Sequence, residues 1–203
     1  MISEGDLQVR RTASELREYV FALKDSAPRD SGEFKRSLLK AGLYKEFLDE
    51  LVPLSCFALL AYPSDYSIQL VRGNQPYDAI VFDAAGNETD RIELTVPQDG
   101  EAEAEDRRLV VNRGFGNIAI GSPGDDFAAL FPFVLRTCRA KARKDYGGCT
   151  VVVAIEPMPP LEGFAKAHEV LVRQLADEIR AINFRAKRVY LLVMPDCLVE
   201  VHS

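Results

Sequence analysis

The sequence predicts an α/β protein with a mixed central sheet and helices on both faces. Two unbroken apolar runs rich in β-branched residues, at 149–157 and 187–195, are typical of strands buried on both faces. A helical stretch joins these runs, which predicts a parallel pair with a right-handed crossover. Upstream, the runs 77–83 and 91–96 flank a turn-rich segment and predict an antiparallel hairpin.

The other elements follow from apolar periodicity and from the positions of glycine and proline. The stretch 33–61 has a helical pattern but is interrupted by Gly42 and Pro53, so it forms one helix or two. In chain order, we expect helices at 12–24 and 33–61, a strand at 66–71, hairpin strands at 77–83 and 91–96, a helix at 131–148, a strand at 149–157, a helix at 161–182, and strands at 187–195 and 197–202.

Two boundaries depend on local composition. Residues 97–126 are rich in Gly, Asp, Glu and Pro, and we expect an irregular excursion with one short strand, GNIAIG, at 116–121. The helix at 131–148 is expected to end at its glycine pair, because glycine is common just beyond a helix C-terminus.

The chain shows no internal repeat and no long linker, so a single domain of residues 1–203 is expected. Within it, residues 1–33 form an N-terminal helical extension, residues 34–155 form the core, and residues 156–203 supply a C-terminal helix and strand.

The composition limits the classes of function. No apolar run reaches the ~18–20 residues that a membrane-spanning helix needs, so no membrane partner is expected. The first twenty residues carry charges throughout and resemble no secretory signal, so we expect a cytoplasmic protein. Two histidines and four widely spaced cysteines offer little material for a zinc site or a Ser-His-Asp triad.

Two carboxylates lie inside the apolar hairpin. Asp78 opens the first strand, and Glu93 projects from the second strand on the face opposite Ile92 and Leu94. Paired strands lie ~4.8 Å apart, and two carboxylates at that separation repel each other unless a cation lies between them. Mg²⁺ or Mn²⁺ would suit such oxygen ligands. The alternative is a solvent-facing Asp78 and a Glu93 paired with Arg91 or Arg113.

These residues and the order of elements resemble the PD-(D/E)xK, or restriction-endonuclease-like, nuclease superfamily. Its common core is αβββαβ, which matches residues 34–155, and Pro76-Tyr77-Asp78 stands where that family has its Pro-Asp turn. The resemblance implies that Asp78 and Glu93 are the metal ligands of a Mg²⁺-dependent endonuclease. It also implies an accessory acidic ligand from the first core helix, Glu46 or Glu50, although the helical pattern turns both toward solvent.

The chain departs from that family at the lysine expected two residues after the glutamate, where Thr95 stands. A threonine can hold a water molecule but supplies no positive charge, and Gln98 is a further candidate for holding a water. Some family members carry the lysine on the following helix. There, at ~100° per residue, Lys141 borders the apolar stripe and is the lysine best placed to reach Glu93. Its catalytic role would be to orient or help deprotonate the attacking water and to offset charge on the phosphate.

The net charge of −6 argues against a nucleic-acid footprint over the whole surface, but a local basic patch occurs at 136–144. Its remaining basic residues either contact a nucleic-acid backbone or form an ordinary solvated face; they are Arg136, Arg139, Arg143 and Lys144.

Three functions stay open at this level. The first is a metal-dependent phosphodiesterase acting on DNA or RNA. The second is a binding or regulatory module that kept the fold and lost the chemistry, which the absent lysine after Glu93 favours. The third is an unrelated α/β domain that serves protein partners. A homodimer is compatible with all three.

Overall fold

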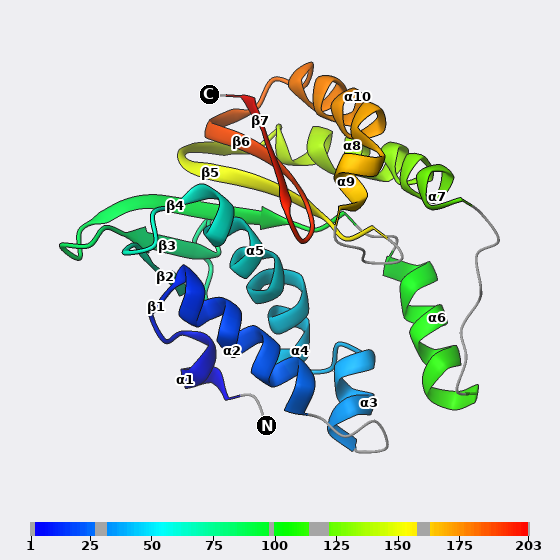
Figure 1. Ribbon diagram of the computed structural model, residues 1–203, viewed down its shortest axis with the longest axis horizontal. Helices are drawn as coiled ribbons and strands as arrows, with labels where there is room; N and C mark the ends of the chain where they lie inside the picture. The colour runs from blue at the N-terminus through cyan, green and yellow to red at the C-terminus, as the bar shows by residue number, and fades with distance from the viewer. Residues whose placement is uncertain (1–2, 27–31, 98–99, 114–121, 158–162, 203) are drawn as a thin grey trace.

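The structure is a computed structural model that describes residues 3–26, 32–97, 100–113, 122–157 and 163–202 (Figure 1). It is an α/β protein with one mixed seven-stranded sheet in the order β1-β2-β3-β4-β5-β6-β7, which confirms the predicted fold class. The strands are β1 (Arg11–Thr12), β2 (Ser67–Leu70), β3 (Ala79–Phe82), β4 (Glu88–Thr95), β5 (Asp145–Ile155), β6 (Arg185–Val193) and β7 (Cys197–His202).

Strand direction divides the sheet into three parts. The strands β1 to β4 pair antiparallel, β4, β5 and β6 are parallel, and β7 returns antiparallel to β6. The parallel pairing of β5 with β6 is the one predicted from the two apolar runs. A helical segment, the β2-β3-β4 meander, a series of helices and β5 follow one another along the chain, which matches the αβββαβ order when those helices count as one helical unit.

Helices cover both faces of the sheet (Figure 1). Helices α2 and α5 pack on one face, and α7, α8 and α10 pack on the other. The helical segments are α1 (Glu4–Leu7), α2 (Ala13–Ser26), α3 (Gly32–Leu38), α4 (Leu43–Glu46), the π-helical turn η1 (Phe47–Leu51), α5 (Val52–Ala61), α6 (Gly100–Arg113), α7 (Pro123–Ala129), α8 (Phe131–Lys141), α9 (Phe164–Ala167) and α10 (Glu169–Arg180).

The sheet separates two hydrophobic cores, and the side chains of β4 alternate between them. Ile92 and Leu94 belong to the core under α2 and α5. Glu93 and Thr95, which alternate with them, therefore point to the α8 face, and both are buried there. The predicted alternation is present, but the face that carries Glu93 is covered by a helix.

Two predicted boundaries were wrong. Residues 100–113 form helix α6, because good helix formers such as Glu, Ala and Arg dominate this stretch; the strand expected at 116–121 lies outside the described residues. Helix α8 ends at Lys141, and the glycine pair lies within β5. There the pairing with β6 shifts register between Tyr146 and Thr150, as is common where glycine interrupts a strand.

The predicted helical stretch at 33–61 forms two separate helical segments. Gly42, with φ of 63°, precedes a continuous helix made of α4, η1 and α5. Pro53 does not interrupt this helix, because it lies in the first turn of α5, beside the π-helical turn. Within the described ranges, the structure contains no helix that is both long and apolar enough to cross a membrane.

Candidate functional site

Asp78 and Glu93 lie side by side on neighbouring strands. Strands β3 and β4 pair Ala79 with Ile92, and extending this register by one residue places Asp78 opposite Glu93. The Asp78 amide donates to the Ile92 carbonyl at 2.7 Å, and the Leu94 amide donates to Asp78 Oδ2 at 2.7 Å. These two bonds fix the Asp78 carboxylate against β4 at the edge where the hairpin begins.

Both Lys141 and Tyr146 contact the Glu93 carboxylate. The Lys141 ammonium forms an ion pair with Glu93 Oε1. The Tyr146 hydroxyl donates to the same oxygen at 3.3 Å, and the ammonium lies 5.8 Å from the centre of the Tyr146 ring. Only 8% of Glu93 is exposed, so it accepts these contacts away from bulk water. The structure thus brings together the three residues that the sequence singled out: Asp78, Glu93 and Lys141.

A third carboxylate comes from the π-helical turn. The Val52 amide donates to the Phe47 carbonyl five residues back, which adds one residue to the turn and changes the direction of its side chains. Glu50 is half-buried there. Burial raises its pKa to about 7, and the negative charge of Asp78 adds to the effect. The solvent exposure expected from a regular helix is therefore wrong for Glu50.

Its neighbour Glu46 does not join the cluster. Instead, Glu46 pairs with the Arg72 guanidinium at 2.8 Å. The charge of Asp78 acts on the pKa of Glu50, one of the two accessory acids implied by the resemblance, and the charge of Glu46 acts on it as well.

Burial and a neighbouring acid raise the pKa of both Asp78 and Glu50. Burial raises the pKa of Asp78 to about 6, the charge of Glu93 contributes, and the Leu94 amide and Lys141 act in the opposite direction. Burial opposes the charged form of Lys141, but its hydrogen bond and charge contact with Glu93 outweigh burial and raise its pKa. The lysine is therefore a cation at neutral pH.

Near the acids, Thr95 has a buried hydroxyl that lacks a hydrogen-bond partner among the described residues. It is two residues beyond Glu93 on the same strand face and is 5% exposed. Its hydroxyl has no hydrogen-bond partner in the described part of the chain. A buried hydroxyl without a partner is costly, so this position suits a water molecule or a ligand oxygen.

The oxygen donors fit a hard divalent ion. Asp78 and Glu93 supply carboxylates, which Mg²⁺ and Mn²⁺ prefer, and Mg²⁺ commonly takes few protein ligands and completes its shell with water and phosphate. No group of three or more His, Cys, Asp or Glu residues placed to hold a metal is found among the described residues. Asp78 and Glu93 are the two protein ligands that the sequence proposed.

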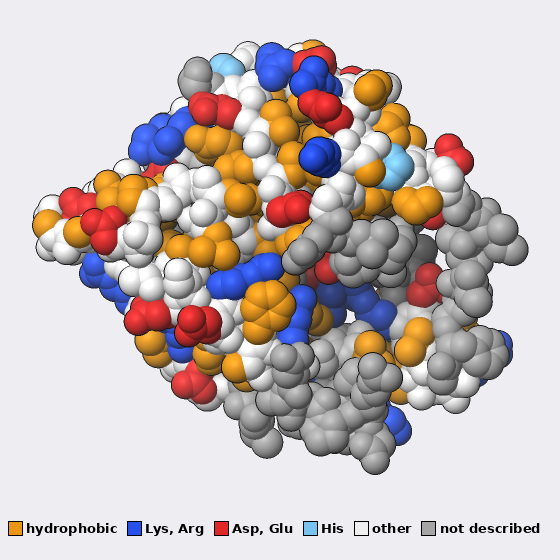
Figure 2. Space-filling view, in the orientation of Figure 1, with side chains coloured by type: hydrophobic (Ala, Val, Ile, Leu, Met, Phe, Trp, Pro, Cys, Tyr) orange, Lys and Arg blue, Asp and Glu red, His pale blue; other side chains and the backbone are white. Residues whose placement is uncertain are grey.

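The other predicted basic residues lie apart from these carboxylates. Arg136, Arg139, Arg143 and Lys144 are exposed on and just beyond α8, and the Arg136 guanidinium covers the Phe133 ring at 4.8 Å. On the face drawn in Figure 2, Lys and Arg side chains are interspersed with Asp and Glu. Gln98 lies outside the described residues.

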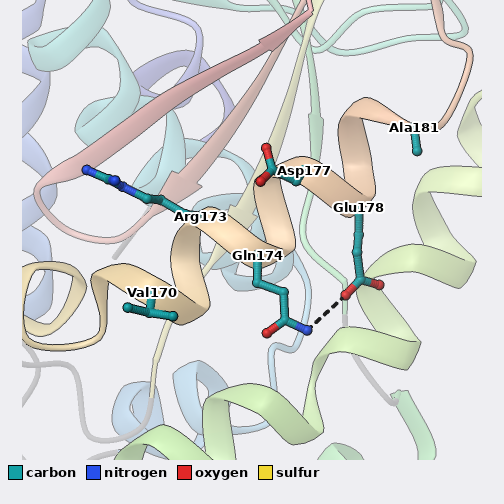
Figure 3. Close-up of a pocket in the computed structure, with 6 residues that line it drawn as sticks. All are labelled: Val170, Arg173, Gln174, Asp177, Glu178 and Ala181. Atoms are coloured by element: carbon teal, nitrogen blue, oxygen red, sulfur yellow. Dashed lines mark hydrogen bonds between the residues drawn. The ribbon is translucent and has the colours of Figure 1, made fainter.

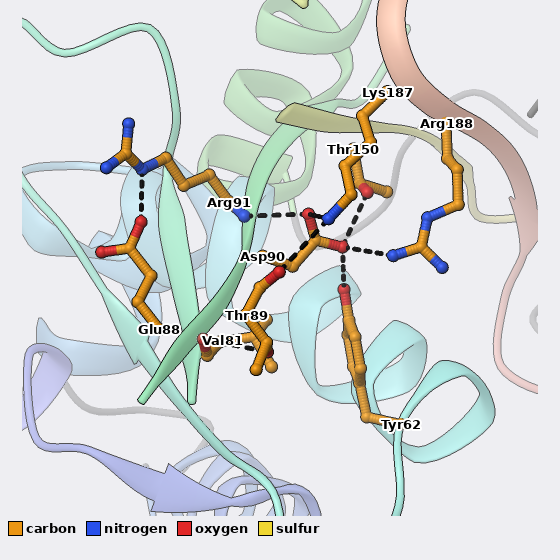
Figure 4. A network of polar contacts seen from close by, with 9 residues as sticks. All are labelled: Tyr62, Val81, Glu88, Thr89, Asp90, Arg91, Thr150, Lys187 and Arg188. Carbon is orange, nitrogen blue, oxygen red and sulfur yellow. Dashed lines mark hydrogen bonds and ion pairs between the residues drawn. The ribbon is translucent and has the colours of Figure 1, made fainter. Parts of the chain in front are cut away.

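A second polar network occupies the opposite face of β4 (Figure 4). Asp90 is 4% exposed. Its carboxylate accepts hydrogen bonds from four side chains and from the Arg91 amide at 2.8 to 3.2 Å; the side chains belong to Tyr62, Thr150, Lys187 and Arg188. Since the donors satisfy both oxygens, this network holds the strands together and leaves no open ligand position.

A pocket on the outer side of α10 contains none of the candidate residues. It is lined by Val170, Arg173, Gln174, Asp177, Glu178 and Ala181 (Figure 3). Gln174 donates to Glu178 at 3.2 Å across it. These side chains come from one helix and form an open surface depression, so the pocket does not compete with the carboxylate site.

Comparison of the chain with protein-family models, curated proteins and solved structures gave no match. The class that fold and site define is a mixed-sheet α/β protein with a partly buried acidic cluster and a lysine beside β3 and β4.

The acidic cluster predicts a pH-dependent stability. Asp78 and Glu50 titrate at about 6 and about 7 in the folded chain, above their ordinary values of 3.8 and 4.5. The folded state thus binds more protons than the unfolded state between about pH 4 and 7, so the free energy of unfolding falls as pH rises through that window. We expect the Tm measured in chelator to fall from pH 5 to pH 8, and Asp78→Asn to flatten the decline.

Asp83→Asn is the matched control on the same hairpin. Hydrogen bonds from Asn87 lower the pKa of the exposed Asp83 carboxylate, so it contributes nothing to a decline above pH 5. A decline of equal slope in the wild type and Asp78→Asn would contradict the assignment.

Proposed function

We propose that this protein is a metal-dependent phosphodiesterase of the PD-(D/E)xK type that cleaves nucleic acid in the cytoplasm. The observation that supports this most is the direct contact of Lys141 with Glu93, beside Asp78. The lysine that the family places two residues after the glutamate is replaced here in space by a lysine from helix α8.

Asp78 and Glu93 would hold the divalent ion. Such an ion lowers the pKa of a bound water and offsets charge that develops on a phosphate. Thr95, whose hydroxyl on the Glu93 side of the strand has no partner among the described residues, would orient a water molecule next to the scissile phosphodiester.

Lys141 would stabilise negative charge and would not act as a base. Its raised pKa keeps it protonated at neutral pH, so it is suited to donating a hydrogen bond and offsetting negative charge, and it is poorly suited to removing a proton from water. Tyr146 holds the same Glu93 oxygen and restricts where the ammonium can lie.

A catalytically inactive binding or regulatory module on the same fold is the second candidate. Thr95 in the lysine position favours it, as does an ion pair that engages Glu93 in the protein alone. In that case the Lys141 pair would be a structural contact, and nucleic acid would be bound without hydrolysis.

Incubation with plasmid DNA and with single-stranded RNA separates the two candidates. We expect cleavage in Mg²⁺ or Mn²⁺, no cleavage in chelator, and no cleavage by Glu93→Gln purified in the same way, which controls for contaminating nuclease. Binding without cleavage in any metal would support the module. Cleavage that persists in chelator would contradict the proposal.

A further inference from the structure

Arg91 lies on the same face of β4 as Glu93, two residues earlier in the strand. Its guanidinium lies 5.1 Å from the centre of the Tyr77 ring, and its Nε donates to Glu88 at 2.6 Å (Figure 4). Tyr77 directly precedes Asp78. One member of this cation–aromatic pair therefore directly precedes Asp78, and the other lies two residues before Glu93 on the same strand face.

Neighbouring contacts place Arg91 at the rim of the acidic site. Strands β4 and β5 pair Ile92 with Thr150, so the preceding residues, Arg91 and Cys149, are neighbours on the α8 face. Cys149 Sγ is 3.9 Å from the Pro76 carbonyl at the bend before Tyr77. Burial raises the pKa of Cys149, Arg91 lowers it, and Glu93, Asp90 and Asp78 raise it, so the thiol lies within reach of Arg91 and of both candidate carboxylates.

Arg91 is the basic residue at this rim with uncommitted donors. Lys141 is engaged by Glu93, but the two Nη groups of Arg91 have no partner among the described residues. The side chain is 45% exposed, so a ligand can reach it. Free Nη groups on a guanidinium held by a ring and a carboxylate suit two-point recognition of a phosphate.

The charge balance of the site requires such a group. Glu50, Asp78 and Glu93 would repel a nucleic-acid backbone, and the Lys141 ammonium is already paired with Glu93. We infer that Arg91, braced by the ring of Tyr77, binds a phosphate group of the nucleic-acid strand beside the cleaved bond. This inference rests on the proposed function, because it assigns the backbone contact of the same site.

The test measures binding separately from cleavage. Fluorescence anisotropy of labelled single-stranded and duplex oligonucleotides is measured in Mg²⁺ with full-length Glu93→Gln, whose expected cleavage is too slow to degrade the probe during the measurement. Adding Arg91→Gln is expected to weaken binding roughly tenfold and to reduce the slope of log affinity against log salt by about 1. Tyr77→Leu is expected to weaken binding less, while Tyr77→Phe, which keeps the ring, is expected to leave it unchanged.

Arg10→Gln is the matched control. Arg10 covers the Phe82 ring at 3.9 Å and donates to Ser67 at 2.6 Å, so it is a second cation–aromatic pair near the same hairpin. Equal losses in Arg10→Gln and Arg91→Gln, no loss in Arg91→Gln, or no binding by the parent would each overturn the inference. If binding depends on Arg91 but the wild-type protein never cleaves nucleic acid, then the inferred phosphate contact stands and the proposed hydrolytic function is wrong.

Discussion

Glu93→Gln is expected to lower the rate of metal-dependent cleavage by about 100- to 1000-fold, the loss typical when one preorganised electrostatic group is removed from an active site. The substitution keeps the side-chain volume and removes a metal ligand that is 8% exposed. It also removes the charge that repels Asp78, so the fold should be retained. Single-turnover cleavage in Mg²⁺ measures the effect, with the Tm measured in parallel.

Lys141→Met is expected to lower cleavage by a similar factor, but for a different reason and with a cost in stability. Among the described residues, it leaves the buried Glu93 carboxylate with the Tyr146 hydroxyl as its remaining side-chain partner. The double variant Glu93→Gln with Lys141→Met removes both charges and should recover most of the lost stability without recovering cleavage. Recovery of cleavage together with stability would show that the pair is structural.

A second half-buried pair, Lys40 with Asp49, is the control for this experiment. Lys40→Met removes a lysine of comparable burial from a different carboxylate and should lower the Tm without lowering the cleavage rate per folded molecule. If Lys40→Met reduces cleavage as much as Lys141→Met does, then loss of ion pairing alone explains the result.

The parts of the site that local periodicity determines were predictable. Alternation along β4 placed Glu93 opposite Ile92 and Leu94, and the border of the apolar stripe on α8 identified Lys141. Both are consequences of one regular element packing on another, so a helix angle or a strand period is enough to find them. The same reasoning located the parallel strands β5 and β6 from their continuous apolar runs.

The parts that depend on irregular backbone were not predictable. A regular helix would turn Glu50 to solvent, whereas in the π-helical turn it is half-buried and the charge of Asp78 acts on its pKa. Tyr146 was assigned to the end of a helix, because a glycine pair is a common helix stop. It belongs instead to the irregular start of β5, where it reaches Glu93.

Asp90 was missed because its partners are distant in sequence. The segment GNETD has the composition of a turn, and Asp90 ends it. Yet the carboxylate is buried and bonded to Tyr62, 28 residues away, and to Arg188, 98 residues away. No local pattern reports contacts of that separation, which arise only when β4, β5, β6 and the end of α5 meet.

Asp90→Ala is expected to lower the free energy of unfolding by about 3–5 kcal/mol, the range measured when one partner of a buried ion pair is removed. The change leaves the Arg188 guanidinium and the Thr150 and Tyr62 hydroxyls without their shared acceptor. Burial raises the pKa of Tyr62 and the charge of Asp90 raises it further, so the phenol stays a donor and loses its acceptor. Urea denaturation followed by circular dichroism measures the loss.

Glu88→Gln provides the comparison on the same strand, since it breaks an ion pair with Arg91 whose side chains are 39% and 45% exposed. Such exposed pairs contribute about 0–1 kcal/mol, so little change is expected.

A loss below about 1 kcal/mol for Asp90→Ala would show that water replaces the carboxylate and that the network does not hold the strands. Because Asp90 and Glu93 lie three residues apart on opposite faces of β4, a large loss would also mean that the network fixes the strand that carries the candidate metal ligand. Cleavage by Asp90→Ala should then decline with the folded fraction, and the rate per folded molecule should remain near that of the wild type.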